Sequence, residues 1–334
     1  MKKLLLSIFN SRLLSSVSCL LFYVFCLLSS ILCLTFVCFT FVSQLNAAFK
    51  YDNYSVRASG LGSAFVGVAD DSNALLFNPA GIAQIEKPEV NFMYSKLFYG
   101  LEDVNLSSNF AGFVYPILKV GSLGFYWTNF VSLNEYSEDI FGFSYGIPVS
   151  ENIYLGLTLK YLGHKYFIDK RTENDPVFSN GKNSKYDISV DFGTLAKFEN
   201  LSLGFSVKNV NEPDIGLKTE DKVSMQITAG LGCNVDEFLF LKNFLTVFDI
   251  SYRDQQWGSN FDKINFNLGF EFYPIKQLTI RVGGNTSEFS LGSGINFSKI
   301  SIFEFQLDYA FLYPLYIKET IGTHRISLVC RFGH

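Results

Sequence analysis

The chain has 334 residues, with 31 acidic against 27 basic side chains and a formal net charge of −4. Hydrophobic residues make up 48% and aromatic residues 17%, while charged residues reach only 17%, below the roughly 25% usual for soluble domains. Such an acidic, aromatic-rich chain argues against nucleic acid as a partner, and its length suits one large all-β domain or two ordinary domains.

Residues 1–48 are expected to be a leader, separate from the folded protein. Three basic residues lie within the first twelve positions, and no further charge follows before residue 50. The apolar stretch ends in Ala47 and Ala48, small residues that suit cleavage by signal peptidase at either position. The stretch is longer than the roughly 7–15 residues of an ordinary signal core and could cross a bilayer, so a retained anchor is the alternative to cleavage.

The next segment, residues 49–88, is rich in small residues and does not alternate like a strand. We expect a helix cap within Asp70–Asn73, and Pro79 suits the first turn of a short helix that ends at Ala83. The run Gly60-Leu61-Gly62 lacks the spacing and the βαβ setting of a nucleotide-binding loop, so we exclude that function.

Apolar and polar residues alternate in segment after segment from residue 89 to Phe332. In Ile302–Phe311, for example, Glu304, Gln306 and Asp308 share one face and the aromatic residues share the other. Because successive side chains of a strand point to opposite sides, each segment has an apolar face and a polar face. The sequence offers no amphipathic helix to cover the apolar faces, so membrane lipid is the predicted partner.

Fourteen such segments predict an all-β fold, a transmembrane antiparallel β-barrel of about 14 strands over residues 89–334 in the bacterial outer membrane. Lipid offers no hydrogen-bond partners to an open sheet edge, so the first and last strands must pair and close the barrel. Connections should alternate in length, with the short ones facing the periplasm. The short connections are predicted at 148–151, 199–200, 274–277 and 298–299, and the long ones at 132–137, 169–184, 209–221, 253–260 and 312–321.

The last strand ends at Phe332, almost at the end of the sequence. This resembles the aromatic-terminated strand by which outer-membrane barrels are recognised for assembly. We therefore expect the outer-membrane assembly machinery to be a partner of the chain.

The run RASGLGSAFVGVADDSNALLFNPAGIA, residues 57–83, resembles the N-terminal segment of FadL-like long-chain fatty-acid transporters and their PorV-type relatives, and most closely that of an uncharacterised spirochaete family of this type. In FadL-like proteins this segment folds inward as a hatch that plugs a fourteen-stranded barrel, and hydrophobic substrates leave sideways through the wall. The resemblance therefore implies a hatch at residues 49–88 inside the lumen. The residues assigned to the hatch are Arg57, Gly60, Gly62, Gly67, Asp70, Asp71, Asn78, Pro79 and Gly81. The outer loops are shorter than those that form the external capture site of the fatty-acid transporters.

The polar strand faces should point into the lumen, and they carry several charged residues. These are Lys160, Asp187, Asp191, Glu271, Arg281, Glu304, Asp308 and Arg325. A charged lumen could guide a solute. A water-facing wall needs polar residues in any case, and ion pairs around the hatch explain the same pattern.

Catalysis has little support, since the three histidines have no nucleophile motif nearby and no metal-binding spacing. We predict no enzymatic activity, no metal and no cofactor. The leading functional hypothesis is a channel that takes up small hydrophobic molecules, such as long-chain fatty acids, by diffusion past the hatch. A PorV-like platform that binds exported proteins is the alternative, followed by a structural barrel or an adhesin.

Overall fold

The computed structural model describes residue 49 and residues 54–102, 105–117, 120–133, 135–178, 180–238, 241–253, 263–297 and 302–333. The predicted leader, residues 1–48, lies outside the described residues, as do most of the predicted loop 253–260 and the predicted turn 298–299. In the described part of the chain before the strands, the structure has the short helices α2 (Val56–Gly60) and α3 (Ala74–Phe77) and the 3-10 helix η1 (Pro79–Gln84). No helix among the described residues is both long enough and apolar enough to cross a bilayer.

The fourteen strands follow in chain order, with the short 3-10 helix η2 (Pro176–Phe178) between the fifth and the sixth. They are β1 (Glu89–Tyr99), β2 (Leu106–Ile117), β3 (Gly121–Ser132), β4 (Tyr136–Ser150), β5 (Ile153–Tyr166), β6 (Ser184–Lys197), β7 (Leu201–Lys208), β8 (Gln226–Phe238), β9 (Leu241–Arg253), β10 (Ile264–Ile275), β11 (Leu278–Asn285), β12 (Glu288–Asn296), β13 (Phe303–Pro314) and β14 (Gly322–Phe332).

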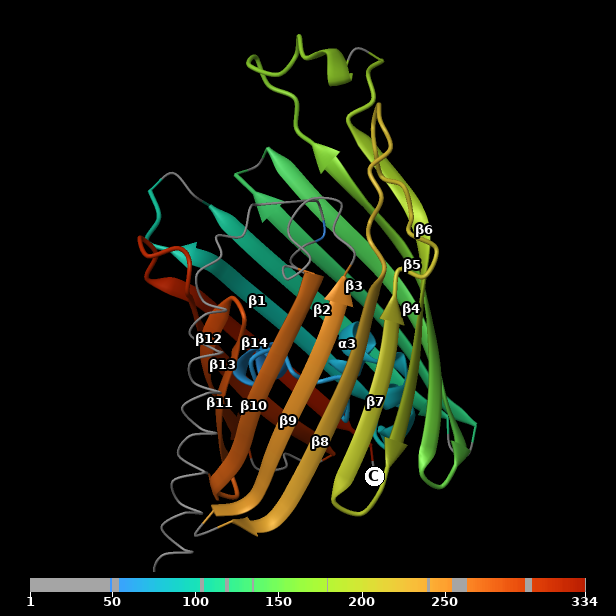
Figure 1. Ribbon diagram of the computed structural model, residues 1–334, viewed down its shortest axis with the longest axis vertical. Coiled ribbons are helices and arrows are strands. Elements are labelled where there is room, and N and C mark those ends of the chain that lie inside the picture. The colour runs from blue at the N-terminus through green and yellow to red at the C-terminus, as the bar shows by residue number, and fades with distance from the viewer. Residues whose placement is uncertain are drawn as a thin grey trace, which may run out of the picture. The chain divides into compact units, whose positions relative to one another are not determined.

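Each strand pairs with its neighbours along the chain, and β1 pairs with β14, so the sheet closes into a barrel (Figure 1). The closing pair is antiparallel and runs from Glu89 opposite Arg331 to Tyr99 opposite Gly322. The predicted all-β barrel of 14 antiparallel strands is therefore confirmed. The short-turn end of the barrel holds the start of β1 and the end of β14, and we take this end as the periplasmic rim.

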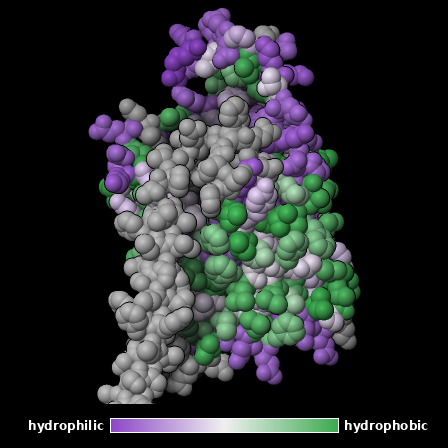
Figure 2. Space-filling view, in the orientation of Figure 1, coloured by the Kyte–Doolittle hydropathy of each residue, from purple (hydrophilic) through white to green (hydrophobic). Residues whose placement is uncertain are grey.

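Alternate strand residues point outward and stay exposed. On β1, Phe92 and Tyr94 are 56% and 50% exposed, whereas the residues that alternate with them, Asn91 and Met93, are buried. Figure 2 shows the result as an apolar band across the visible strands, with hydrophilic surface above and below it. Lipid tails are the partner that such a band is suited to meet.

Two predicted details of the strands are wrong. The connection predicted as long at 132–137 is a short one, because β3 continues to Ser132 and β4 already begins at Tyr136. The apolar alternation also predicts an eighth strand that already contains Val223 and Met225, whereas β8 begins only at Gln226. Val223 is buried in a small apolar cluster, because an apolar pattern by itself does not distinguish a lipid-facing position from a buried one.

The wall made of β4, β5 and β6 rises beyond the end of β7 (Figure 1). β6 pairs with β5 over 13 residue pairs but with β7 only from Phe192 to Lys197. Residues 209–225, which we call the outer lobe, cover the edge that β7 leaves open. The Val210 amide donates to the Val190 carbonyl at 2.9 Å, and the Asn211 side chain donates to the Ile188 carbonyl at 2.7 Å.

A charged contact ties the outer lobe to the same edge. The Lys185 ammonium of β6 lies 2.5 Å from an Asp214 carboxylate oxygen of the lobe, and this hydrogen bond is the main cause that lowers the pKa of Asp214 to about 2. The pair is about one third exposed, so it fixes the position of the lobe more than it adds to stability.

Residues 54–88, which we call the N-terminal segment, lie inside the barrel. Helix α2 packs against β11 to β14, and η1 packs against β2 to β6. Between them, Val66 and Gly67 lie against Gly204 of β7 and Gly230 of β8. The segment thus contacts strands all around the ring, and its Leu61, Phe65, Leu75 and Ile82 form the centre of the apolar core.

Candidate functional site: the N-terminal segment and the barrel wall

The N-terminal segment lies so close to the wall that many wall positions can hold only glycine. A Cβ atom added to any of six inward-facing wall glycines would overlap an atom of the segment. These glycines are Gly156, Gly193, Gly204, Gly230, Gly269 and Gly283. Glycine is the residue that allows another backbone to approach a strand this closely. The segment and the wall are therefore fitted to each other at the level of their backbones.

The residue pair Gly283 and Gly284 offers a test of this fit. A Cβ at Gly283 would overlap the Gly62 amide nitrogen, whereas a Cβ at Gly284 has Glu288 O as its nearest neighbour, at 3.6 Å. We expect Gly283→Ala to destabilise the folded protein by about 1–3 kcal/mol, as overpacking usually does. Gly284→Ala, one residue away, should stay within about 0.5 kcal/mol. Urea unfolding of both variants in detergent measures the difference, and equal losses would contradict the close fit.

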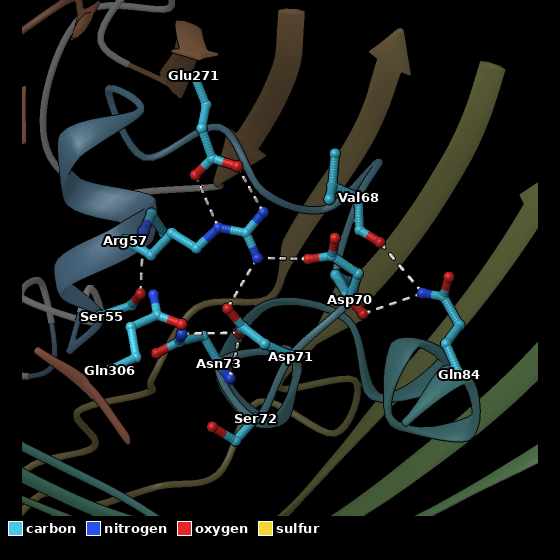
Figure 3. A network of polar contacts seen from close by, with 12 residues as sticks. Ser55, Arg57, Val68, Asp70, Asp71, Ser72, Asn73, Gln84, Glu271 and Gln306 are labelled. Carbon is cyan, nitrogen blue, oxygen red and sulfur yellow. Dashed lines mark hydrogen bonds and ion pairs between the residues drawn. The ribbon is translucent and has the colours of Figure 1, made fainter. Parts of the chain in front are cut away.

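Arg57 is the charged centre of the interface (Figure 3). Its guanidinium contacts Asp70 at 2.6 Å and Asp71 at 2.9 Å within the segment, and it forms a bidentate pair with Glu271 of β10, with both N–O distances at 3.0 Å. The Glu271 side chain is only 2% exposed and that of Asp71 only 6%. Arg57 thus contacts two well-buried carboxylates at once, and it joins the start of the segment to its middle and to the wall.

The network continues along the inner wall from Glu271. Arg281 of β11 contacts Glu271 and Asp308 of β13, each at 2.6 Å. Arg331 of β14 pairs with Glu89 of β1 at 2.6 Å. Glu89 then accepts a hydrogen bond from the Ser72 backbone amide at 2.8 Å, which returns the network to the segment. Inside a barrel wall, pairing of this kind is what makes buried charges tolerable.

Two polar side chains satisfy backbone groups of the segment. Asn78 is fully buried, donates to the carbonyls of Val66 and Thr194 at 3.0 and 2.9 Å, and caps η1 by accepting from the Ala80 amide. Asp249 of β9 accepts from the amides of Phe65 and Val66 at 2.7 and 2.9 Å. Both residues replace hydrogen bonds that an irregular backbone inside a barrel would otherwise lack.

The remaining residues assigned to the hatch make close packing contacts with the wall or with the segment itself. Gly60 lies against Arg281 and Gly292, Gly62 against Gly284, and Gly67 against Leu231. Pro79 is the first residue of η1 and contacts Gly156 of β5. Gly81 contacts Ala69 of the segment itself, where a Cβ would overlap the Ala69 carbonyl.

The eight charged residues predicted to face the lumen do not form one site. Glu271, Arg281 and Asp308 belong to the network described above, and Arg325 donates to Ser59 Oγ of α2 at 2.9 Å. The other four lie elsewhere. Lys160 pairs with Asp191 at 2.6 Å on the opposite wall, Glu304 pairs with Lys87 at the half-exposed rim, and Asp187 accepts from the Asp214 amide of the outer lobe at 2.9 Å.

Two cavities border the N-terminal segment. The larger, of about 560 Å³, opens near the periplasmic rim and is lined by charged side chains that include Arg57, Asp70 and Arg331. The smaller, of about 40 Å³, lies on the other side and is lined by both apolar and basic side chains, among them Leu76, Tyr126 and Lys160. An acyl chain needs an elongated apolar cavity, and neither of these two offers one.

Sequence reasoning missed Glu89 and Asp249 as residues of this interface. Both lie at strand positions whose side chains point inward, since Glu89 alternates in step with the buried Asn91, and Asp249 with the buried Val247. Parity was therefore a usable signal for both. Within the N-terminal segment, both carboxylates bind backbone amides, which no side-chain pattern predicts.

A comparison with family models matches residues 71–329 to one family, described as type IX secretion system membrane protein PorP/SprF. The chain belongs to the PorP/SprF family. The match begins within the N-terminal segment, at Asp71, and ends in β14, so it spans almost the whole barrel of this PorP/SprF-family protein. None of the proteins with a curated description matches the chain.

Solved structures show the same fold. The deltaS2 mutant of the TodX monoaromatic hydrocarbon channel is 10% identical, covers 86% of this chain and all of its own length, and has a TM-score of 0.55. The toluene transporter TodX of Pseudomonas putida (10% identity, 82% of this chain, 96% of its own, TM-score 0.49) and a FadL homologue of Pseudomonas aeruginosa (12%, 82%, 97%, 0.49) are also similar. The chain is a bacterial outer-membrane barrel with a TodX-like fold. The resemblance to a spirochaete family stays a prediction.

Proposed function

We propose that this protein serves type IX secretion as a closed outer-membrane platform, on which exported proteins are bound at the outer side while the lumen stays plugged. The observation that carries the proposal is that the N-terminal segment lies inside the barrel in a member of the PorP/SprF family. Its backbone fits the glycines of the wall, and buried ion pairs hold it there. A solute path through the barrel would have to break these contacts.

The outer side offers a surface for such binding. The extended β4–β6 wall, the loop 167–183 and the outer lobe stand above the level of the other strands (Figure 1). Phe167, Ile168 and Val177 of this loop are between 41% and 45% exposed. Exposed apolar side chains beyond the membrane band favour contact with a protein partner.

A cysteine pair tests whether secretion needs the lumen. A Cβ on Gly60 lies 3.2 Å from the Gly292 Cα, and a Cβ on Gly292 lies 3.1 Å from the Gly60 Cα. The two positions are therefore in direct contact, and Gly60→Cys together with Gly292→Cys is the pair with which α2 can be cross-linked to β12, once loss of both thiols confirms the disulfide. In cells that depend on this variant, we expect the amount of exported protein in the medium to be the same with the disulfide oxidised or reduced. The reduced form of the same variant is the control. A loss of secretion on oxidation alone would contradict a closed platform.

Uptake of small hydrophobic molecules is the second candidate. The likeness in fold to the TodX monoaromatic hydrocarbon channel supports it, and Leu76 and Tyr126 give the cavity of about 40 Å³ an apolar side from which a larger path would have to open. If this is the function, purified protein should bind a fluorescent fatty-acid analogue, and Leu76→Trp should abolish binding by filling the cavity. No binding by the unaltered protein would leave secretion as the proposal that stands.

A further inference from the structure

Phe49 is held in the outer half of the barrel. It is 6% exposed and packs in a small apolar cluster with Leu162 of β5 and with Ile215 and Val223 of the outer lobe. The N-terminal segment begins at residue 54 and leads to the periplasmic rim, where β1 starts at Glu89. Phe49 and the N-terminal segment together therefore reach from the outer half of the barrel to the periplasmic rim.

The main chain of Phe49 has two unusual features. Its amide nitrogen donates to Glu138 Oε1 at 2.9 Å, in a buried contact between residues 89 positions apart. Its φ angle is 59°, in the left-handed region that side chains with a Cβ rarely adopt. The φ angle depends on the peptide bond that joins Phe49 to residue 48. A free amino terminus has no such bond and no such strain.

Glu138 is a buried carboxylate that receives no cation from the residues that the structure describes. It lies three residues into β4 and is 5% exposed. It accepts hydrogen bonds from the Phe49 amide and from the Tyr136 hydroxyl, both at 2.9 Å. Buried carboxylates are normally paired with a positive charge, because two neutral donors replace only part of the lost hydration.

We propose that the leader is cut between Ala48 and Phe49, and that Glu138 is the preformed acceptor for the new α-ammonium group of Phe49. In the cut, water adds to the Ala48 carbonyl carbon and the C–N bond breaks. Ala48 leaves with a carboxylate, and Phe49 keeps its nitrogen as a protonated amine. The atom that now donates to Glu138 then carries the missing charge at the same place.

The cut also decides how the chain is anchored. An ion pair at Phe49 fixes the N-terminus near the outer end, while Arg57 fixes the segment near the periplasmic rim.

The first test identifies the mature N-terminus. The full chain is produced with its own leader, purified from the outer membrane and digested, and the N-terminal peptide is sequenced by mass spectrometry. We expect the sequence to start at Phe49. A start at any other residue, or a retained leader, overturns the proposal.

The second test detects the ion pair by the reactivity of the new amine. A reagent that labels α-amines at neutral pH is applied to folded and to heat-unfolded protein. We expect labelling of the folded protein to be at least ~10-fold slower, because the paired and buried amine reacts only through local opening. Glu138→Gln should remove most of this protection while it keeps the shape of the side chain.

Glu135→Gln is the matched control, since it makes the same change at a side chain that is 50% exposed, in the connection just before β4. Its labelling rate should equal that of the unaltered protein. Equal rates for folded and unfolded protein, or full protection in Glu138→Gln, would show that Glu138 does not hold the amine.

Discussion

Deletion of residues 55–83 should turn the closed barrel into an ion-conducting pore. The deleted residues include α2, α3 and most of η1, and these elements carry the contacts to β2–β6 and β11–β14. Without them the inner wall still carries its charged side chains, and the lumen fills with water. Barrels of about 16–18 strands enclose an aqueous channel, and a barrel of 14 strands is not much narrower. In planar lipid bilayers, we expect no resolvable current steps from the unaltered protein and steady open-channel current from the deletion variant.

The barrel itself should survive this deletion. The pairs Arg281–Asp308 and Arg331–Glu89 lie entirely within the wall, and carboxylates that lose a partner in the segment gain water instead. Circular dichroism and slow migration of the unboiled protein in gels would verify that the strands remain closed. A folded deletion variant without current would show that something other than the N-terminal segment blocks the lumen.

The barrel could be predicted from the sequence because lipid and lumen enforce a simple alternation. One face of each strand meets lipid tails, so a row such as Phe303, Leu307 and Tyr309 fixes the register of β13 without knowledge of its neighbours. The alternation fails where the surroundings change. Val223 fits the apolar pattern of a strand, yet it belongs to the outer lobe and is buried there against Phe49, Leu162 and Ile215, since apolar side chains pack equally well against protein.

Only part of the interface between the segment and the wall could be predicted from the sequence. The resemblance of residues 57–83 pointed to the segment, and parity placed Glu271, Arg281 and Asp308 on the inner face. Neither could show that Arg57 joins Asp71 to Glu271, because these residues are up to 214 positions apart. Contacts of this kind depend on where an irregular backbone lies inside the barrel, and periodicity carries no information on that.

The family suggests secretion and the fold suggests a channel, and the contacts inside the barrel bear on which of the two functions is less costly. The TodX-like fold alone fits a channel or a platform equally well. A segment joined to the wall by backbone contacts and by buried ion pairs costs much free energy to displace, whereas binding at the outer lobe requires no displacement. This difference in cost favours secretion over passage through the lumen.

Arg57→Met should destabilise the protein by about 3–5 kcal/mol, the loss expected when one partner of a buried pair is removed. Methionine keeps much of the apolar stem but leaves Asp71 without its cation, and Glu271 with Arg281 alone. Urea unfolding in detergent measures the loss. Limited proteolysis should also cut within residues 54–88 of this variant under conditions in which the unaltered segment is protected.

Two further variants show that the effect comes from buried charge. Lys87→Met breaks a pair whose side chains are 36% and 37% exposed, so it should cost no more than about 1 kcal/mol. Asp71→Asn keeps an oxygen for the Asn73 amide but removes the charge, so adding it to Arg57→Met should cost less than the sum of the two single changes. Strictly additive losses would mean that the two side chains are not coupled, and that Arg57 stabilises the segment through packing alone.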